Sequence, residues 1–319
     1  MNIAVTYNVP PEEKVIYNEF PFPEAQFLFL KELSDEQRIQ ALRNAGILLT
    51  WNLPRELSGN EISALGKVKL VQLLSAGYDH LNLKLFPADC IIASNQGAYA
   101  EPMAEHTVAM ILALSKRFLI NHQKMMKGEF DQKTPTIMLK NTICGIIGFG
   151  SIGKAVAKLL KSFGVKIFAI NTSGKTGEDV EFTGTLKDLE YVLRNSDIIL
   201  ISIPLDDSTK GLFGKNELKM MKQNAILINV ARGAIINEKD LYEHLKANPN
   251  FMVGLDAWWN EPFNSGEFRL NYPFFELPNV LGSPHNSAII PGALFEGQKR
   301  ALENINRFLN GKELIGIAN

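Results

Sequence analysis

Three polar side chains that could carry proton and hydride transfer each lie a few residues after a separate apolar run. They are Arg232, Glu261 and His285. The carboxyl ends of parallel strands share one edge of an open sheet, so we expect the three side chains to meet there. A guanidinium can hold a carboxylate through two parallel hydrogen bonds, and an imidazole can exchange a proton near neutral pH. The set predicts hydride transfer to a 2-oxo acid, with Glu261 fixing the imidazole tautomer.

Each of these residues alone has an ordinary structural explanation. An arginine after a strand usually forms a surface ion pair, and Glu261-Pro262 and Pro284-His285 could simply mark turns. Their occurrence after three successive apolar runs favours the chemical interpretation.

A glycine pattern follows another apolar run at 142–147. It reads Gly148-x-Gly150-x-x-Gly153, and a helical pattern begins at Lys154. Strand, glycine turn and helix in this order are typical of dinucleotide binding: Gly148 permits the tight turn, Gly150 leaves room for a pyrophosphate, and Gly153 permits close helix packing. The alternative is a tight turn without a ligand. The N–H groups of the first helical turn face phosphate charge, and the predicted contacts are Gly148, Gly150, Ser151, Ile152 and Gly153.

The end of the next predicted strand, 165–170, bears on the choice of dinucleotide. NAD-preferring sites carry Asp or Glu about 20 residues after the glycine turn, and this chain has Asn171 there. An amide does not repel a 2′-phosphate. Thr172 and Ser173 offer hydroxyl groups and Lys175 offers positive charge, although no arginine, the usual phosphate clamp, lies nearby. The sequence favours NADP, with NAD as the alternative cofactor.

Apolar runs that alternate with helical patterns predict two doubly wound parallel sheets. In the first hundred residues the expected strands are 3–7, 25–28, 46–50, 70–74 and 90–93, and the expected helices are 34–44 and 56–65. Ser34 and Gln37 form a capping-box pattern at the start of the first helix. One long amphipathic helix is expected over 102–121.

The alternation starts afresh near residue 141. Six further strands are expected at 142–147, 165–170, 198–203, 225–229, 252–256 and 280–282, with helices between them. A last helix, 291–310, stops at Gly311 and should return to the N-terminal domain. We therefore predict an α/β protein of two Rossmann-like doubly wound parallel-sheet domains with a cleft between them. The substrate-binding domain would be discontinuous (1–97 plus 287–319), and the dinucleotide-binding domain would span 98–286.

Composition excludes several classes of protein. The chain has 319 residues, 46% of them hydrophobic, and a net charge of −1 without a basic stripe, so nucleic acid is not an expected partner. No apolar run is long enough to span a membrane, and the N-terminus lacks a signal-peptide pattern, which predicts a cytoplasmic protein. Cys90 and Cys144 stand apart, so no metal site is expected.

The motifs, taken in order, resemble the D-2-hydroxyacid dehydrogenase family, and the glyoxylate/hydroxypyruvate reductase-like members in particular. The resemblance covers nearly the whole chain. It is carried by Ala76-Gly77, Ala104-Glu105, Pro204-Leu-Asp-Asp-Ser-Thr209-Lys-Gly211, Ile228-Asn-Val-Ala-Arg232-Gly233, Gly254-Leu-Asp256, Glu261-Pro262 and Pro284-His285.

This resemblance assigns roles to individual residues. Arg232, Glu261 and His285 correspond to the family's catalytic arginine, glutamate and histidine. Asp256 corresponds to the residue that contacts the nicotinamide carboxamide, and Thr107 lies on the helix segment that reaches the cofactor.

The resemblance also implies the remaining contacts. Backbone amides of Ala76 and Gly77 would hold the substrate carboxylate, with Arg232 and His285 completing the substrate site. Further cofactor contacts would come from Pro204, Thr209 and Ala231. A homodimer built on the region 101–140 is implied as well.

Some positions depart from the family pattern. Asn286-Ser287 replaces an apolar residue followed by a small one, which bears on substrate preference. The Trp258-Trp259 pair could wall the substrate pocket or pack on neighbouring helices. Glu261 stands where the related formate dehydrogenases place glutamine.

The activity predicted from all this is NAD(P)-dependent reduction of a small 2-oxo acid, such as glyoxylate, hydroxypyruvate or a pyruvate-like acid, to its D-2-hydroxy acid. Closure of the two domains would exclude water. Two alternatives stay open: a corepressor-like protein that senses dinucleotides, and a dehydrogenase of a non-carboxylate anion such as phosphite.

Overall fold

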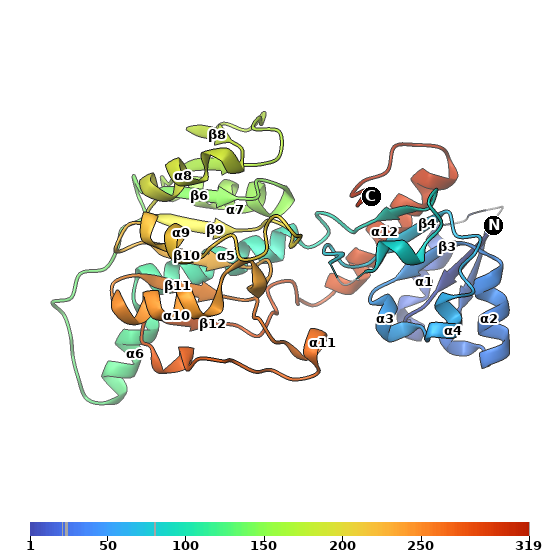
Figure 1. Cartoon of the computed structure of the whole chain (residues 1–319), viewed down its shortest axis with the longest axis horizontal. Helices are drawn as coiled ribbons and strands as arrows, with labels where there is room; N and C mark the ends of the chain where they lie inside the picture. Colours follow the sequence, from blue (N-terminus) through green and yellow to red (C-terminus); the bar gives the residue numbers. More distant parts are fainter. Residues whose placement is uncertain (21, 23–24, 80, 319) are drawn as a thin grey trace. The chain divides into compact units, whose positions relative to one another are not determined.

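The structure is a computed structural model, and it describes residues 1–20, 22, 25–79 and 81–318. The chain folds into two compact units, Met1–Tyr99 with Ile290–Asn319 and Ala100–Ile289 (Figure 1). The chain passes from one unit to the other after Tyr99 and returns after Ile289. The sequence predicted these crossings after residues 97 and 286.

The first unit contains a five-stranded parallel sheet in the order β2-β1-β3-β4-β5. Its strands are β1 (Asn2–Val5), β2 (Gln26–Phe29), β3 (Ala45–Thr50), β4 (Leu70–Leu73) and β5 (Ile91–Ala93). This is the flavodoxin-like order of a doubly wound sheet. All five predicted strands are confirmed, with ends that differ by one or two residues.

Helices cover both faces of this sheet. One face packs on α1 (Val15–Glu19) and α12 (Ala293–Leu309), and the other on α2 (Asp35–Arg43), α3 (Leu53–Glu56) and α4 (Gly59–Ile62). The capping box at the start of α2 is confirmed, because Ser34 and Gln37 bond each other's backbone N–H groups. Helix α12 packs on β4 and α1, which confirms the predicted return of the last helix.

The single helix predicted over 56–65 is wrong. The chain forms two short helices instead. Glu56 ends α3, and its carboxylate accepts the N–H groups of Trp51 and Asn52 in the turn before that helix. A second capping box, made by Ser58 and Glu61, then starts α4.

The second unit contains a seven-stranded parallel sheet in the order β12-β11-β10-β9-β6-β7-β8. Its strands are β6 (Ile143–Ile147), β7 (Lys166–Ile170), β8 (Phe182–Gly184), β9 (Ile198–Ile201), β10 (Ile226–Asn229), β11 (Met252–Leu255) and β12 (Val280–Gly282). The six predicted strands are present. The edge strand β8 was missed, because three residues are too few to show a periodic pattern.

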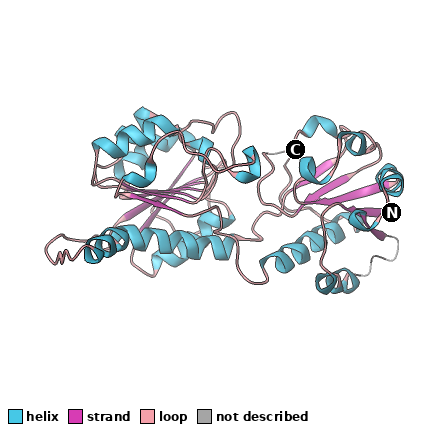
Figure 2. Cartoon of the chain, turned by 90° about the horizontal axis from the view of Figure 1, so that it is seen from below, coloured by secondary structure: helices cyan, strands magenta, loops and turns pink. Residues whose placement is uncertain are grey.

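Figure 2 shows helices on both faces of this second sheet. Helices α5 (Ala100–Ser115) and α7 (Ser151–Lys161) pack on one face, and α8 (Leu189–Asn195), α9 (Lys215–Met220) and α10 (Glu238–Ala247) pack on the other. The long helix predicted over 102–121 is divided, because Arg117 adopts a left-handed backbone (φ 54°) between α5 and α6 (Phe118–Met126).

The remaining helices are short. They are α11 (Pro262–Ser265) and the 3₁₀ turns Pro11–Glu13, Leu30–Glu32, Leu83–Leu85, Leu186–Asp188, Gly233–Ile235 and Phe274–Glu276. Among the described residues, none of the helices combines the length and apolar character that crossing a membrane requires.

The first and second glycines of the motif serve different purposes. Gly148 has φ 106°, and a Cβ atom there would lie 2.6 Å from the backbone of Ser202 and Ile203. A Cβ on Gly150 would meet no atom within 4 Å. The fold therefore requires glycine at position 148 but not at position 150.

We expect Gly148→Ala to lower the free energy of unfolding by about 1–3 kcal/mol or more, since overpacking adds to an unfavourable backbone. Gly150→Ala is the matched control and should stay within about 1 kcal/mol of the parent. Urea unfolding followed by circular dichroism measures both. Equal losses in the two variants would contradict this division of roles.

Candidate active site

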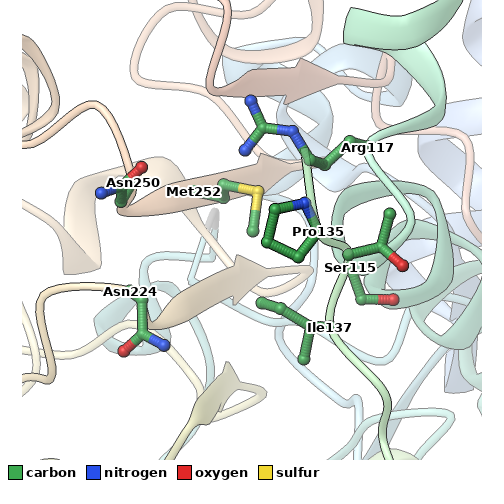
Figure 3. Close-up of a pocket in the computed structure, with 8 residues that line it drawn as sticks. Ser115, Arg117, Pro135, Ile137, Asn224, Asn250 and Met252 are labelled. Carbon is green, nitrogen blue, oxygen red and sulfur yellow. The ribbon is translucent and has the colours of Figure 1, made fainter. Parts of the chain in front are cut away.

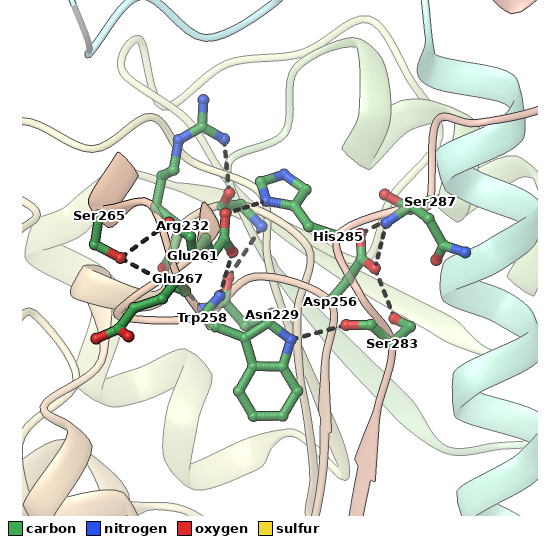
Figure 4. A network of polar contacts seen from close by, with 12 residues as sticks. Asn229, Arg232, Asp256, Trp258, Glu261, Ser265, Glu267, Ser283, His285 and Ser287 are labelled. Carbon is green, nitrogen blue, oxygen red and sulfur yellow. Dashed lines mark hydrogen bonds and ion pairs between the residues drawn. The ribbon is translucent and has the colours of Figure 1, made fainter. Parts of the chain in front are cut away.

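The three predicted catalytic residues follow three strands that are neighbours in the sheet, β10, β11 and β12. His285 Nδ1 lies 2.7 Å from Glu261 Oε2 (Figure 4). The other carboxylate oxygen of Glu261 accepts the backbone N–H of Trp258 at 2.6 Å. The Glu261 side chain is 7% exposed and that of His285 is 34% exposed. The sheet therefore brings a buried carboxylate and a partly exposed imidazole together, and leaves the imidazole Nε2 for another partner.

Arg232 is brought to the same edge by a backbone contact. A Cβ on the next residue, Gly233, would lie 2.5 Å from the Trp258 carbonyl oxygen and 2.6 Å from the Trp259 nitrogen. The backbones after β10 and β11 thus touch, and only glycine fits between them. Arg232 Nη1 donates to the Ala231 carbonyl at 2.8 Å, which orients the partly buried guanidinium.

Asp256 is fully buried at the end of β11. Its carboxylate accepts the Ser283 hydroxyl at 2.6 Å and the backbone N–H groups of Asn286 at 3.1 Å and Ser287 at 3.2 Å. Burial raises the pKa of the Asp256 carboxyl. The hydrogen bonds from Ser283 and Ser287, with the imidazoles of His285 and His106, outweigh burial and hold that pKa below its usual range.

The dinucleotide turn lies where the strand order reverses, between β6 and β9, which is where doubly wound sheets bind ligands. The turn after β6 contains Gly148 and Gly150, and the N–H groups of the first turn of α7, at Ser151, Ile152 and Gly153, have no partner within the helix. The open space beside Gly150 fits the approach of a pyrophosphate. The residues present therefore fit a dinucleotide.

The loop after β9 forms the other side of this switch point. Thr209 is buried, donates its hydroxyl proton to the Pro204 carbonyl at 2.8 Å and accepts the Asp206 N–H at 2.8 Å. Hydrogen bonds, first of all from the Ser208 hydroxyl, hold the pKa of Asp206 below its usual range despite partial burial. The loop is thus held by its own side chains.

The turn after β7 is organised by Asn171. Its Oδ1 accepts the Gly174 N–H at 2.7 Å and the Ser173 hydroxyl at 3.1 Å, and its Nδ2 donates to the Lys175 carbonyl at 2.8 Å. Thr172, Ser173 and Lys175 are exposed. The amide therefore shapes a turn whose polar side chains face solvent.

Three further residues are predicted to contact ligands, one in the second unit and two in the first. Thr107 is fully buried on α5, and its hydroxyl donates to the Met103 carbonyl at 2.7 Å. Ala76 and Gly77 follow β4 in the first unit, where the Ser75 hydroxyl donates to the Gly77 carbonyl at 2.7 Å. Ligand contacts by these residues stay predictions.

The tryptophan pair packs inside the second unit. Trp258 is buried and its indole N–H donates to the Ser283 carbonyl at 2.8 Å. Trp259 donates to the Ile236 carbonyl at 2.7 Å and stacks on Phe274 with ring centroids 5.3 Å apart. Of the two interpretations left open by the sequence, the structure favours packing.

Two site-adjacent residues were not predicted from the sequence. His106 Nε2 lies 3.0 Å from Ser283 Oγ, across 177 positions of the chain. No local pattern signals this pair, because it depends on how α5 lies beside β12.

A cavity of about 130 Å³ lies elsewhere in the second unit (Figure 3). Asn224 and Asn250, which line it, precede β10 and β11, so it is at the amino end of the strands rather than at the Arg232 and His285 edge. Within the described part of the chain, no group of three histidine, cysteine or acidic side chains is placed to hold a metal ion.

Known proteins resemble the chain closely enough to show its family. The family model for D-isomer specific 2-hydroxyacid dehydrogenase, NAD binding domain, matches residues 108–287. The chain is 28% identical over 302 residues to a glycerate dehydrogenase of Methylorubrum extorquens, with 92% of each protein covered. It is 31% identical over 286 residues to a glyoxylate reductase of Aeropyrum pernix, with 87% of this chain and 84% of that protein covered.

A solved structure shares the fold. The D-isomer specific 2-hydroxyacid dehydrogenase of Lactobacillus delbrueckii ssp. bulgaricus, in its NAD-complexed form, matches with a TM-score of 0.79 at 22% identity over 100% of both chains. Two parallel α/β units with a glycine turn of this kind define a dinucleotide-binding protein. The chain belongs to the D-isomer specific 2-hydroxyacid dehydrogenase family. The predicted family, fold class and NAD(P)-dependent enzyme class are confirmed.

We expect Glu261→Gln to lower kcat/KM about ten- to hundredfold in both reaction directions. A carboxylate accepts at both oxygens, whereas an amide offers one acceptor and one donor group. If the amide oxygen accepts the Trp258 N–H, its NH₂ group faces His285 Nδ1 and disfavours a proton there. If the amide is turned over, its NH₂ group faces the Trp258 N–H, and two donors then lie together without an acceptor.

Steady-state kinetics in both directions test this prediction. Glu267→Gln is the matched control, because the Glu267 side chain is 68% exposed and its charged partner is Arg269. Unchanged activity in Glu261→Gln would show that the carboxylate has no part in orienting the imidazole.

Proposed function

We propose that the protein reduces a small 2-oxo acid to its D-2-hydroxy acid. The observation that carries the proposal is the His285–Glu261 pair at 2.7 Å, at the sheet edge that Arg232 also reaches. An imidazole fixed through Nδ1 presents Nε2 as a proton donor to a substrate. The guanidinium beside it is suited to hold the carboxylate of that substrate.

The roles of the residues follow from these positions. Arg232 would bind the carboxylate and polarise the neighbouring carbonyl. His285 would give its Nε2 proton to the carbonyl oxygen as hydride reaches the carbonyl carbon, which yields the alcohol, and would take that proton back in oxidation. Glu261 would keep Nδ1 protonated throughout. The bound nicotinamide supplies the hydride.

Acids of two or three carbons, such as glyoxylate, hydroxypyruvate or a pyruvate-like acid, are the proposed substrates. Relatives named glyoxylate reductase and glycerate dehydrogenase support this choice. Backbone amides of Ala76 and Gly77 are proposed to contact the substrate carboxylate as well. Proposed cofactor contacts beyond the glycine turn are Thr107, Pro204, Thr209, Ala231 and Asp256.

NADP is the proposed cofactor, with NAD as the alternative. The absence of a carboxylate at Asn171 supports this, because nothing at that position would repel a 2′-phosphate. The exposed Thr172, Ser173 and Lys175 give the turn hydroxyl groups and positive charge.

We also propose a homodimer built on the region 101–140. Large apolar side chains are strongly exposed there: Phe118 (63%), Met126 (75%), Phe130 (73%) and Met138 (66%). Apolar side chains gathered on one segment commonly mark a protein interface.

The first test of the function is His285→Ala. We expect kcat for 2-oxo acid reduction to fall about 10²- to 10⁴-fold, because the proton donor is removed. Cofactor affinity, followed by NADPH fluorescence, should be retained and serves as the control. A variant that keeps near-parental turnover with glyoxylate or hydroxypyruvate would remove His285 from this role.

The second test concerns the cofactor. The parent should prefer NADPH, and Asn171→Asp should shift the ratio of kcat/KM toward NADH about ten- to hundredfold, since a charged hydrogen bond contributes ~1.5–3 kcal/mol. Asn171→Ser is the matched control, because it also disturbs the turn but adds no charge. A parent that prefers NADH would contradict the proposed NADP preference. If Asn171→Asp and Asn171→Ser had the same ratio of kcat/KM for the two cofactors, Asn171 would not lie at the ribose.

A further inference from the structure

A chain of hydrogen bonds connects helix α5 with the loop that carries His285. His106 Nε2 lies 3.0 Å from Ser283 Oγ, and that hydroxyl donates to Asp256 Oδ1 at 2.6 Å. His106 Nε2 is also 3.7 Å from the same carboxylate oxygen. The His106 side chain is 26% exposed, whereas that of Asp256 is fully buried. The chain thus runs from a partly exposed imidazole to a buried charge.

The direction of each hydrogen bond follows from the groups involved. An ionised carboxylate only accepts hydrogen bonds, so the single proton of the Ser283 hydroxyl must point to Asp256. Ser283 Oγ is then the acceptor toward His106, and the proton between them belongs to His106 Nε2. The chain therefore selects the His106 tautomer that carries a proton on Nε2.

Asp256 secures the loop on both sides of His285. It accepts the Ser283 hydroxyl before His285, and the backbone N–H groups of Asn286 and Ser287 after it. His285 itself has a left-handed backbone, with φ 51°. Residues with a Cβ atom seldom adopt this conformation unless the surroundings impose it. The carboxylate bonds on either side are suited to impose it here.

We infer that His106 and Ser283 are positioning residues for His285. By directing the Ser283 proton onto Asp256, they keep that carboxylate turned toward the loop and so hold the imidazole beside Glu261. The inference rests on the proposed function only in taking His285 as the proton donor. The hydrogen-bond chain itself is independent of any activity.

Matched pairs of variants separate the hydrogen bonds from the space that the side chains fill. Ser283→Ala and His106→Leu break the chain, whereas Ser283→Thr keeps the hydroxyl and His106→Gln keeps an N–H donor in place of Nε2. We expect kcat to fall about ten- to hundredfold in the first pair. The second pair should keep kcat within roughly threefold of the parent value.

The double variant Ser283→Ala/His106→Leu adds a second criterion. Residues that act through one chain are non-additive, so its kcat should equal that of Ser283→Ala. The inference is overturned if Ser283→Ala and His106→Leu keep kcat within about threefold of the parent value. It is also overturned if Ser283→Thr and His106→Gln lose as much kcat as that first pair, or if the two losses multiply in the double variant.

Nitrogen-15 NMR of the imidazoles provides a test that needs no activity. The chain has five histidines, so each signal can be assigned from one substitution. In the parent, His106 Nε2 should give the signal of a protonated nitrogen. The His285 signals should move in Ser283→Ala and stay in place in Ser283→Thr. An unprotonated His106 Nε2, or His285 signals that do not move in Ser283→Ala, overturns the inference.

The two experiments distinguish the inference from the proposed function. If the parent reduces none of the 2-oxo acids, the proposed function fails, and the imidazole signals still decide whether the chain positions His285. If the parent is active and the His285 signals do not move in Ser283→Ala, the inference alone fails.

Discussion

The contact between Gly233 and the backbone of Trp258 and Trp259 is the constraint on which the site depends. A methyl group at Gly233 would overlap that backbone, so the loops after β10 and β11 can approach only because one residue has no side chain. This approach sets the Arg232 loop against the Glu261 loop. Moving the loops apart by even ~1 Å would matter, because catalytic groups need their geometry held within about that tolerance.

Two buried carboxylates then occupy the same sheet edge in different surroundings. Burying either carboxylate without a partner would lower the stability of the fold, since an uncompensated buried charge costs several kcal/mol. Asp256 is compensated by a hydroxyl and two backbone N–H groups, and so is tied to the loop that it holds. Glu261 is compensated by one backbone N–H and one imidazole. Of the two, Glu261 has the partner whose protonation can change during a reaction.

Much of this arrangement could be predicted because strand periodicity and strand order suffice for it. Once β10, β11 and β12 are recognised as parallel neighbours, the residues after them must share an edge, and Glu261 and His285 do meet there. The failures have local causes. Strand β8 has only three residues, which are too few to show a pattern. The break between α5 and α6 comes from the left-handed backbone of Arg117, which few sequence patterns predict. The His106–Ser283 pair depends on how a helix lies beside a distant strand.

The glycine motif shows why a sequence pattern can predict a fold more firmly than a ligand. Gly148 and Gly153 are required by the protein itself, because a Cβ at either position would lie 2.6 Å from backbone atoms. Gly150 has no such neighbour, so the fold gives no reason for glycine there. Within the motif, the space beside Gly150 is the feature that points outward to a pyrophosphate. The same distinction applies at the sheet edge. Gly233 and Asp256 are explained by packing and hydrogen bonding within the protein, whereas the Nε2 of His285 is explained only by the proposed function, which places a substrate there.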